Sequence, residues 1–374
     1  MLPYGRQSIS EDDIAAVAAI LRGDWLTTGP SVTAFEEAIS VATGGHRAIS
    51  ATSGTAALHM AYAAAGVGPG DQVVTTPMTF VATASCASIL GAEIVFADVE
   101  EDTALLDPAA VEAVLTERTK VVAAVDYAGH PADYDALQPL ADRVGALTLD
   151  DAAHSVGGTY RGRPVGDLAD LTTLSFFPTK NLTTGEGGAV IAKDPAIAQR
   201  AHEFHFIGLV RDPDRFEILD EGPWHQEVHE LGINYRLTDL ASALGLSQLA
   251  RLAAFKQRRT EITARYNAAL AGVDGVRVPA QRPDVDPAWH LYPVRILEGR
   301  RREAFEKMRE KGIGVQVNYI PVYWHPVYAR LGYQRGMCPN AEAFYAEELS
   351  LPLYPDLTDD QVDQVTSTLT EVLG

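Results

Sequence analysis

Lys180 is the residue of this sequence with the clearest capacity for covalent chemistry. It follows an apolar segment, residues 174–178, and precedes the glycine-rich sequence GEGG at 185–188. A lysine rarely follows so apolar a run unless it is paired or reactive. A partly buried lysine loses proton affinity and becomes a usable amine nucleophile, whereas an ordinary lysine would extend its side chain to solvent. The local sequence leaves both interpretations open.

Two adjacent carboxylates form a second candidate group. Asp150 and Asp151 come directly after the apolar run 146–149, and His154 follows them closely. A carboxylate at the carboxyl end of a buried strand points into the ligand crevice of an α/β sheet. We expect one aspartate to cap a helix, and the inward one to need a cation, because a buried charge without a partner is costly. A protonated pyridine nitrogen would be such a cation.

Two further groups could bind anions. Ser53, Gly54 and Thr55 stand directly before a helix rich in alanine and leucine. Backbone N–H groups at a helix N-terminus can close on a phosphate, although an ordinary N-cap has the same sequence. Asn234 and Arg236 open a long helical pattern. They could bind an anionic group across an interface, or they could simply begin the helix.

In chain order these groups describe a single site: a phosphate loop, a strand-end aspartate, then Ser175 and Lys180. Pyridoxal phosphate (PLP) needs each of them. Its phosphate needs amide and hydroxyl donors, its pyridine nitrogen needs a carboxylate, and its aldehyde needs a lysine amine. The sequence therefore predicts a PLP-dependent enzyme that carries its cofactor on Lys180.

Composition and missing motifs argue against other classes of protein. The net charge of −20 argues against general binding of nucleic acid or anionic membranes. The sequence has no P-loop, no dinucleotide-binding GxGxxG, no GxSxG nucleophile motif and no histidines at zinc-ligand spacing, so we expect no metal. The N-terminus lacks the features of a signal peptide, and Cys86 and Cys338 form no redox motif. We expect a cytoplasmic protein with reduced thiols and no membrane segment.

Alternating strand and helix patterns predict the elements that position these residues. A capping box at Ser10 and Asp13 predicts a first helix, and a second should begin near Ser31. The alternation from residue 52 to 195 predicts an α/β domain with a largely parallel sheet. The expected strands are 72–75, 93–97, 120–125, 146–150, 171–176 and 189–192, and the expected helices are 55–65, 80–90, 108–115 and 132–144.

The pattern changes after Tyr235. One long helix is expected over 237–270, followed by a smaller α+β region. We therefore expect a PLP-binding large domain over residues 1–250 and a small C-terminal α+β domain over 251–374. The elements expected in the second region are strands at 293–296 and 314–318 and helices at 300–311, 340–349 and 359–373.

The motifs together resemble the DegT/StrS family of PLP-dependent sugar aminotransferases, which have fold type I. The resemblance extends nearly from end to end, in one order. The segments that carry it are WLTTGP at 25–30, SGTAAL at 53–58, TFVATA at 79–84, DAAH at 151–154, SF at 175–176, Lys180, GEGG at 185–188 and NYRL at 234–237.

The resemblance implies roles for residues around the cofactor's reactive end. Lys180 would form the imine with PLP and later move the proton between Cα of the substrate and C4′ of the cofactor. Asp151 would pair with the pyridine nitrogen. Phe80 would stack on the ring, and His154 would lie against its phenolic side.

The resemblance also implies how the phosphate is held. Gly54, Thr55 and Ser175 would bind it from within the chain. Asn234 would reach the phosphate of the neighbouring subunit's cofactor, which implies a homodimer with sites built across the interface.

Within the family, the chain resembles most closely a branch of pseudaminic acid biosynthesis. Those enzymes move an amino group from L-glutamate to C4 of a UDP-linked 4-keto-6-deoxy-N-acetylhexosamine. The likeness includes PYGRQSI at 3–9, DYAG at 126–129 and NYIPV at 318–322. The residues that would line the nucleotide-sugar pocket are Tyr4, Asp24, Trp25, Leu26, Thr27, Asn318, Tyr319, Ile320 and Pro321.

Two positions depart from this branch and keep alternatives open. Phe177 stands where the branch usually has a histidine, and the sequence FPTKNL resembles other branches, some of which aminate C3. Asp126 stands where relatives more often have histidine. The alternatives are an aminotransferase for C3 or another nucleotide keto sugar and, from another class, a non-catalytic PLP-binding sensor. A sugar dehydratase of the same family would have another residue at the position of Lys180.

Overall fold

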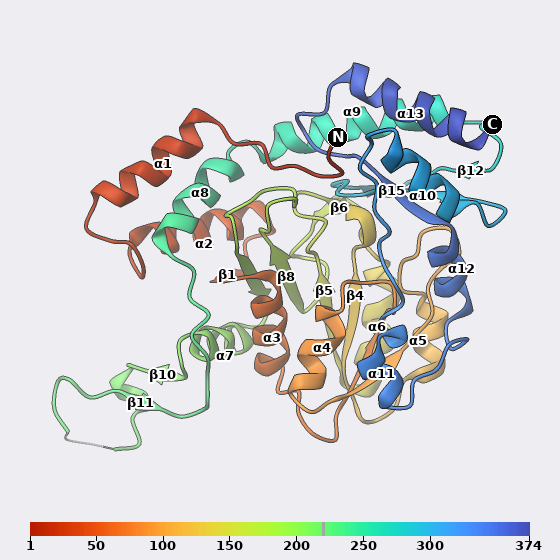
Figure 1. Cartoon of the computed structure of the whole chain (residues 1–374). Helices are drawn as coiled ribbons and strands as arrows, with labels where there is room; N and C mark the ends of the chain where they lie inside the picture. The colour runs from red at the N-terminus through yellow and green to blue at the C-terminus, as the bar shows by residue number, and fades with distance from the viewer. Residues whose placement is uncertain (219–220) are drawn as a thin grey trace.

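A seven-stranded sheet lies at the centre of the computed structural model, which describes residues 1–218 and 221–374 (Figure 1). Its strands are short, rich in valine and alanine, and mostly buried, as expected for a sheet covered on both faces. The strands, in sheet order, are β1 (Arg47–Ala51), β9 (Gly188–Ala192), β8 (Leu171–Ser175), β5 (Leu147–Asp151), β4 (Thr119–Val125), β2 (Gln72–Thr75) and β3 (Glu93–Phe96). Within this sheet β9 alone runs antiparallel to its neighbours.

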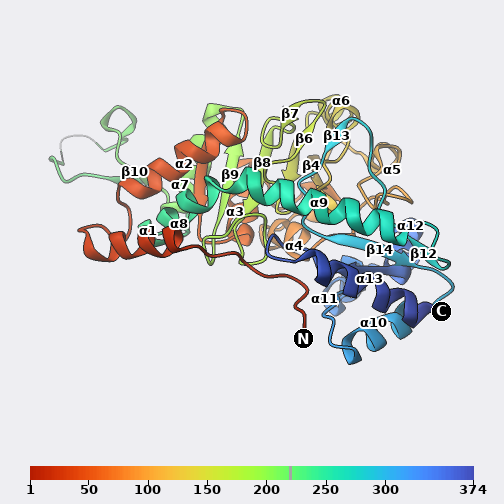
Figure 2. The ribbon, with the colours of Figure 1, turned by 90° about the horizontal axis from the view of Figure 1, so that it is seen from above.

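Helices cover both faces of the sheet. Figure 2 shows α5 (Pro108–Val114) and α6 (Tyr134–Val144) on the opposite side from α3 (Gly54–Ala64) and α4 (Ala82–Ile89). Helix α3 is apolar around most of its circumference because it packs against α4, α7 (Pro195–His205) and the sheet. The predicted α/β fold with a largely parallel sheet is confirmed.

A group of three helices packs at the β1 edge of the sheet. Helices α1 (Glu11–Arg22) and α2 (Pro30–Ala42) both contact α8 (Asp239–Leu249). The capping box predicted for α1 is present, since Ser10 accepts from the Asp13 N–H and Asp13 accepts from the Ser10 N–H.

The prediction of one long helix over residues 237–270 is wrong. Two helices, α8 and α9 (Leu252–Leu270), are separated at Ala250 and Arg251. No glycine or proline marks the break, so the apolar pattern passes through it. The break has a tertiary reason: α8 packs on α1 and α2, whereas α9 runs across to α13 (Asp359–Leu373). We propose that residues 1–250 and 251–374 form two domains that meet here.

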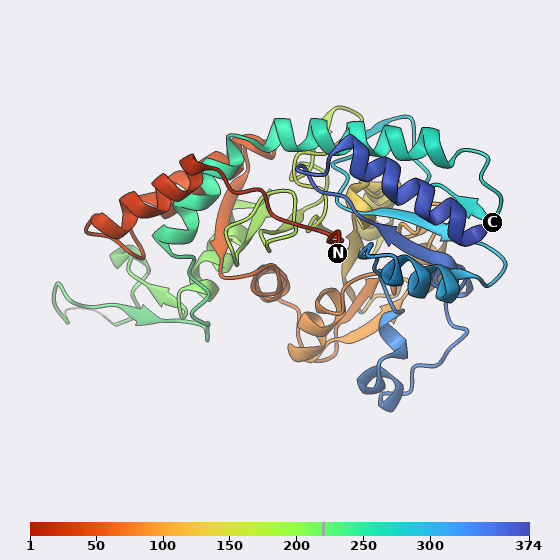
Figure 3. The same ribbon diagram turned by 45° about the horizontal axis from the view of Figure 1, so that its top comes forward.

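The C-terminal part is a three-stranded antiparallel sheet covered by helices (Figure 3). Two expectations are wrong. The strand predicted over 314–318 makes only one bridge, between Gln316 and Ser350, because Gly314 bonds to Leu2 of the N-terminal segment instead. The helix predicted over 340–349 ends at Glu347, where a strand begins. The elements of this part are β12 (Val276–Arg277), β14 (Tyr292–Ile296), β15 (Glu348–Leu351), α10 (Arg301–Glu310), α11 (Pro326–Arg330) and α12 (Pro339–Glu347).

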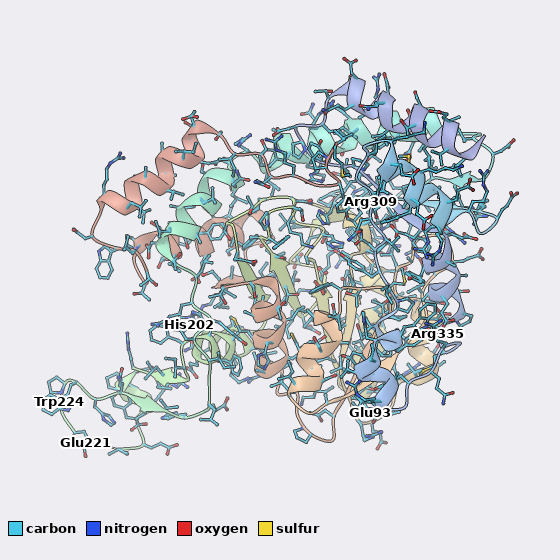
Figure 4. The ribbon with its side chains drawn as sticks, viewed as in Figure 1. Glu93, His202, Glu221, Trp224, Arg309 and Arg335 are labelled. Carbon is cyan, nitrogen blue, oxygen red and sulfur yellow. The ribbon has the colours of Figure 1, made fainter. Side chains whose placement is uncertain are left out.

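An arm projects from the large sheet after α7 (Figure 1). It contains the short hairpin of β10 (Leu209–Val210) and β11 (Glu227–Val228), and Figure 4 shows Trp224 at its outer end. The remaining elements are the small sheet of β13 (Val285–Asp286), β6 (Thr159–Tyr160) and β7 (Arg163–Pro164), and the 3₁₀ turns η1 (Tyr127–Gly129), η2 (Pro213–Arg215) and η3 (Val322–Trp324).

Among the described residues, no helix combines the length and the apolar character needed to cross a bilayer. Both cysteines, Cys86 and Cys338, are buried free thiols.

Candidate active site

A cavity of ≈ 610 Å³ opens at the carboxyl ends of β4, β5 and β8. This is the place where parallel α/β sheets bind their ligands, because connections to either side leave a crevice there. The N-terminus of α3 contributes one wall, and the segment before η3 contributes another. The predicted site residues that line the cavity are Tyr4, Gly54, Thr55, Phe80, Asp151, His154, Ser175, Lys180, Asn318 and Tyr319.

Lys180 is a buried, cavity-facing amine. The residue lies in the turn after β8, where its N–H donates to the carbonyl of Phe177 (2.9 Å). The residue as a whole is partly exposed, and its side chain lines the cavity. Burial lowers the pKa of Lys180 to about 8, and the charge of Asp151 opposes part of that effect. Of the two interpretations open from the sequence, the structure supports the usable nucleophile.

Asp151 is the aspartate that faces the cavity. The Thr83 hydroxyl donates to its Oδ2 (2.6 Å), and the Ala153 N–H donates to its Oδ1 (3.3 Å). Burial raises the pKa of Asp151, whereas Thr83 and the nearby Lys180 act in the opposite direction. The carboxylate is thus fixed by two donors and lies close to a buried cation.

Asp150 points to the opposite face of β5, since successive side chains of a strand alternate. It lies beside Asp126, whose carboxylate accepts from the Ala132 N–H (2.9 Å), the Tyr134 hydroxyl (3.0 Å) and the Ser155 hydroxyl (2.6 Å). Neither oxygen of Asp150 has a hydrogen-bond partner within the described ranges. Burial, and then the nearby Asp126, raise the pKa of Asp150. The expectation that one of the two aspartates caps a helix is therefore wrong, because both belong to β5.

The N-terminus of α3 and Ser175 form a tight cradle. Ser53 caps the helix by accepting from the Ala56 N–H (3.1 Å), so the N-cap interpretation is confirmed. A Cβ at Gly54 would lie 2.8 Å from Cβ of Ser175 and 2.9 Å from its Oγ. Only glycine lets the two segments approach this closely. The cradle therefore offers helix N-terminal amides and a hydroxyl together, which are the donors that a phosphate requires.

Two histidines and a tyrosine also line the cavity. The Tyr319 hydroxyl lies 3.1 Å from Nε2 of His154, and the rings of His154 and His290 have centroids 4.5 Å apart. Burial lowers the pKa of both histidines well below the usual value, so both are neutral. Nδ1 of His154 is buried without a hydrogen-bond partner in the described part of the chain. Such an atom suits a polar ligand group at this position.

Comparison with known families identifies the chain. A sequence profile of the DegT/DnrJ/EryC1/StrS aminotransferase family matches residues 7–370. The chain belongs to this family. The prediction from the sequence motifs is confirmed over the whole chain.

Relatives of this aminotransferase family match the chain along its full length. The spore coat polysaccharide biosynthesis protein SpsC of Bacillus subtilis is 38% identical, over 100% of this chain and 97% of SpsC. The candidate sugar aminotransferase Spr1654 of Streptococcus pneumoniae, in its PMP form, superposes with a TM-score of 0.94 at 30% identity, covering 100% of this chain and 99% of that one.

Helicobacter pylori PseC, an aminotransferase of pseudaminic acid biosynthesis, gives a TM-score of 0.92 at 29% identity, with 99% and 98% of the two chains covered. Spr1654 has also been solved in a PLP form. The predicted fold type and PLP as the cofactor are confirmed at the level of the aminotransferase family.

Several residues expected at the site lie outside the cavity of this aminotransferase chain. Residues 24–27 are exposed in the loop between α1 and α2, and Thr27 forms a bridge with Thr238. Ile320 is exposed, and Pro321 is buried. Asn234 is exposed and accepts from Nε of Arg236 (3.0 Å). The residues that do not line the cavity of their own chain are Asp24, Trp25, Leu26, Thr27, Asn234, Ile320 and Pro321. Asn234 is expected at the neighbouring subunit's cofactor, so its position agrees with that expectation, and the roles of all seven residues stay predictions.

The cavity of the aminotransferase also contains residues that motif reasoning did not single out. Thr83 lies one helical turn after Phe80 in the TFVATA segment, and that spacing could have indicated it. His290 and Gln316 come from the C-terminal part, more than a hundred residues after Asp151. No local pattern in the sequence links these two residues to the site.

Proposed function

We propose that this chain is a PLP-dependent sugar aminotransferase that acts on a nucleotide-linked keto sugar. The observation that carries the proposal is the joint placement of Lys180 and Asp151 in one cavity with the cradle of Gly54 and Ser175. The cavity thus has an amine nucleophile, a carboxylate for a ring cation and donors for a phosphate. L-Glutamate is the proposed amino donor, and C4 of a UDP-linked 4-keto-6-deoxy-N-acetylhexosamine is the proposed acceptor.

The residues divide the chemistry between them. When bound, PLP supplies an electron sink that stabilises the negative charge left at Cα after deprotonation. Lys180, with its lowered pKa, would take the proton from Cα of glutamate and return it at C4′, and the reverse transfer would serve the sugar. Asp151, held by Thr83, would keep the ring nitrogen protonated. Thr55 and Ser175 would hold the phosphate, and Phe80 would confine one face of the ring.

The sugar side of the cavity is lined by Tyr4, Asn318 and Tyr319. Their hydroxyl and amide groups suit the hydroxyl and acetamido groups of a hexosamine. The likeness to PseC, an aminotransferase of pseudaminic acid biosynthesis, supports the branch for which the sequence resemblance implies amination at C4. Phe177 lines the same cavity at the position where that branch usually has a histidine, and the sequence around it resembles branches of which some aminate C3, so a C3 aminotransferase is the second candidate.

We further propose a homodimer in which Asn234 reaches the partner's cavity. Asn234 is exposed and lies outside the cavity of its own chain. The arm that precedes it exposes large apolar side chains, including Trp224 at 78% and Leu231 at 91%. Apolar exposure of this size is typical of an interface between chains.

A half-reaction screen tests the proposed function. The cofactor of the purified enzyme is first converted to its amine form with L-glutamate, and excess donor is removed. The amine form is then offered a panel of nucleotide 3-keto and 4-keto sugars. We expect the UDP-linked 4-keto-6-deoxy-N-acetylhexosamine to restore the PLP absorbance and mass spectrometry to find an amine at C4.

The outcomes separate the alternatives. Restoration by a 3-keto sugar alone would replace the proposal with the C3 aminotransferase. Restoration by no keto sugar would favour a PLP-binding sensor. The Lys180→Ala variant, loaded with PLP, is the control and should complete neither half-reaction.

A further inference from the structure

A buried hydrogen-bond network lies behind the sugar side of the cavity. Asn318 is at its centre, and its Nδ2 donates to the Tyr4 hydroxyl (2.8 Å) and to Oγ of Ser350 (3.1 Å). The Tyr127 hydroxyl donates to the Asn318 carbonyl (2.5 Å). The network therefore joins two cavity residues, Tyr4 and Asn318, that come from opposite ends of the chain.

Glu348 closes this network from outside the cavity. It lies at the start of β15 with an exposed fraction of 0%, and its Oε2 accepts from the Asn318 N–H (2.6 Å). The Ser350 hydroxyl lies 2.5 Å from its Oε1. Its register partner on β14, Arg295, pairs with Glu347 instead (2.7 Å). Glu348 is thus a buried acid that makes its short contacts with Asn318 and Ser350, and the proposed chemistry assigns it no role.

The network also anchors the N-terminal segment. Leu2 pairs with the backbone of Gly312 (2.7 Å) and Gly314 (2.8 Å), and the Leu353 N–H donates to the Tyr4 carbonyl (3.2 Å). These backbone bonds hold the segment against the C-terminal part, as Figure 3 shows. They do not orient the Tyr4 side chain. The Tyr4 hydroxyl is oriented by members of the network, since it accepts from the Asn318 amide and also lies within hydrogen-bonding reach of Ser350.

We propose that Glu348 is a positioning residue for the amino acceptor: through Asn318 and Ser350 it fixes Tyr4 and Asn318 in the orientation that binds the sugar. This inference rests on the proposed sugar aminotransferase function. The hydrogen bonds that fix Lys180, Asp151 and the start of α3 are made with other residues, none of which belongs to this network. Loss of Glu348 should therefore weaken binding of the keto sugar and leave the glutamate half-reaction unchanged.

Glu348 acts by hydrogen bonding and not by charge. Burial raises its pKa to about 8, with Ser350 and the Asn318 N–H acting in the opposite direction, so the neutral form prevails at pH 7. Glutamine has the same shape as that neutral form. Its carbonyl can accept from the Asn318 N–H, and its amide can donate to Oγ of Ser350. Alanine can do neither and leaves the Asn318 N–H buried without an acceptor.

The test compares Glu348→Ala, Glu348→Gln and the matched control Glu347→Ala in the PLP-loaded enzyme. Glu347 is adjacent and acidic, but it pairs with Arg295 at the surface side. In Glu348→Ala we expect KM for the keto sugar to rise by about tenfold or more, the factor that loss of one buried hydrogen bond gives. Its glutamate half-reaction and cofactor absorbance should match the wild type. Glu348→Gln should restore the sugar KM to within about threefold, and Glu347→Ala should leave it unchanged.

Equal losses in both half-reactions of Glu348→Ala would overturn the proposal, because they would mean a general defect. An unchanged sugar KM in Glu348→Ala, or a loss in Glu348→Gln as large as in Glu348→Ala, would overturn it too. If the wild type itself accepts no keto sugar, the proposed function fails, and amide hydrogen exchange then tests the network alone. Faster exchange at Asn318 in Glu348→Ala and not in Glu348→Gln supports the network, and equal exchange in all variants overturns it.

Discussion

At the scale of single residues, adjacent side chains have opposite environments. Asp151 faces the cavity and is fixed by Thr83, whereas Asp150 faces Asp126 on the other side of β5. Both are buried, but only Asp151 has a cation nearby, the ammonium of Lys180. The chemical difference between two identical residues therefore comes from the pleat of one strand.

Exchanging each aspartate for asparagine should separate these roles. Asp151→Asn removes the charge that would keep the ring nitrogen protonated, so the rate of the glutamate half-reaction should fall by about two to three orders of magnitude. Asp150→Asn is the matched control, because asparagine resembles the protonated carboxyl that burial favours there. Stopped-flow absorbance gives both rates. Equal losses in the two variants would contradict the assignment of Asp151.

The lowered pKa of Lys180 predicts a pH dependence for cofactor loading. Only the neutral amine attacks the PLP aldehyde, and the neutral fraction grows as the pH rises through the pKa. With a pKa of about 8, the loading rate of the apoenzyme should rise up to pH 8 and level off above it. A solvent-exposed lysine should keep rising to about pH 10. The rate is followed by absorbance after mixing apoenzyme with PLP, and a midpoint near that of free lysine would refute the buried amine.

At the scale of elements, the start of α3 decides how a phosphate can be held. Ser53 caps the helix, which leaves the next amides to face the cavity beside Ser175. Helix α3 can sit this close to β8 because Gly54 has no Cβ. The sequence feature that looks like an ordinary cap is therefore also a binding surface.

Gly54→Ala should weaken cofactor binding. Its Cβ would meet Ser175 at 2.8 Å and displace either the hydroxyl or the helix start. We expect the dissociation constant for PLP to rise by about tenfold, as for the loss of one phosphate hydrogen bond. Gly68→Ala is the control, since no atom lies within 4 Å of a Cβ there. Fluorescence titration of the apoenzymes gives both constants, and equal values for the two variants would argue against the cradle.

At the scale of the molecule, one chain provides most residues of the proposed site, whereas other residues expected at the site are exposed on its surface. Residues 24–27 and Asn234 are exposed and do not line the cavity of their own chain. Figure 4 shows the arm with Trp224 extending away from the sheet. A second chain would cover this apolar surface and bring these residues to a cavity.

Mixed dimers should demonstrate the shared site. Lys180→Ala and Asn234→Ala homodimers should each be impaired. In a heterodimer of the two, one cavity receives Lys180 from one chain and Asn234 from the other, so activity should return to about half of the wild-type value, one intact site in two. The chains are mixed after partial unfolding and assayed with L-glutamate and the keto sugar. No recovery, together with a monomer in sedimentation analysis, would contradict the dimer.

The sequence by itself determined the family, the fold class and the groups around Lys180, because those residues lie in short segments at strand ends. Local patterns also located most strands and the capping box of α1. They missed the break between α8 and α9, which arises from packing on α1 and α2. The periodicity of apolar residues shows which side of a helix is buried, but it does not show the direction of the helix axis.

Only the tertiary structure decided which distant residues meet. Tyr4 and Asn318 are 314 residues apart in the sequence, and Glu348 follows Asn318 by 30 residues, on another element. No rule of sequence spacing connects these three residues. The same is true of His290 beside His154. The contact of Tyr4 with Asn318 exists because the N-terminal segment packs against the C-terminal part, and such long-range contacts depend on the packing of the whole chain.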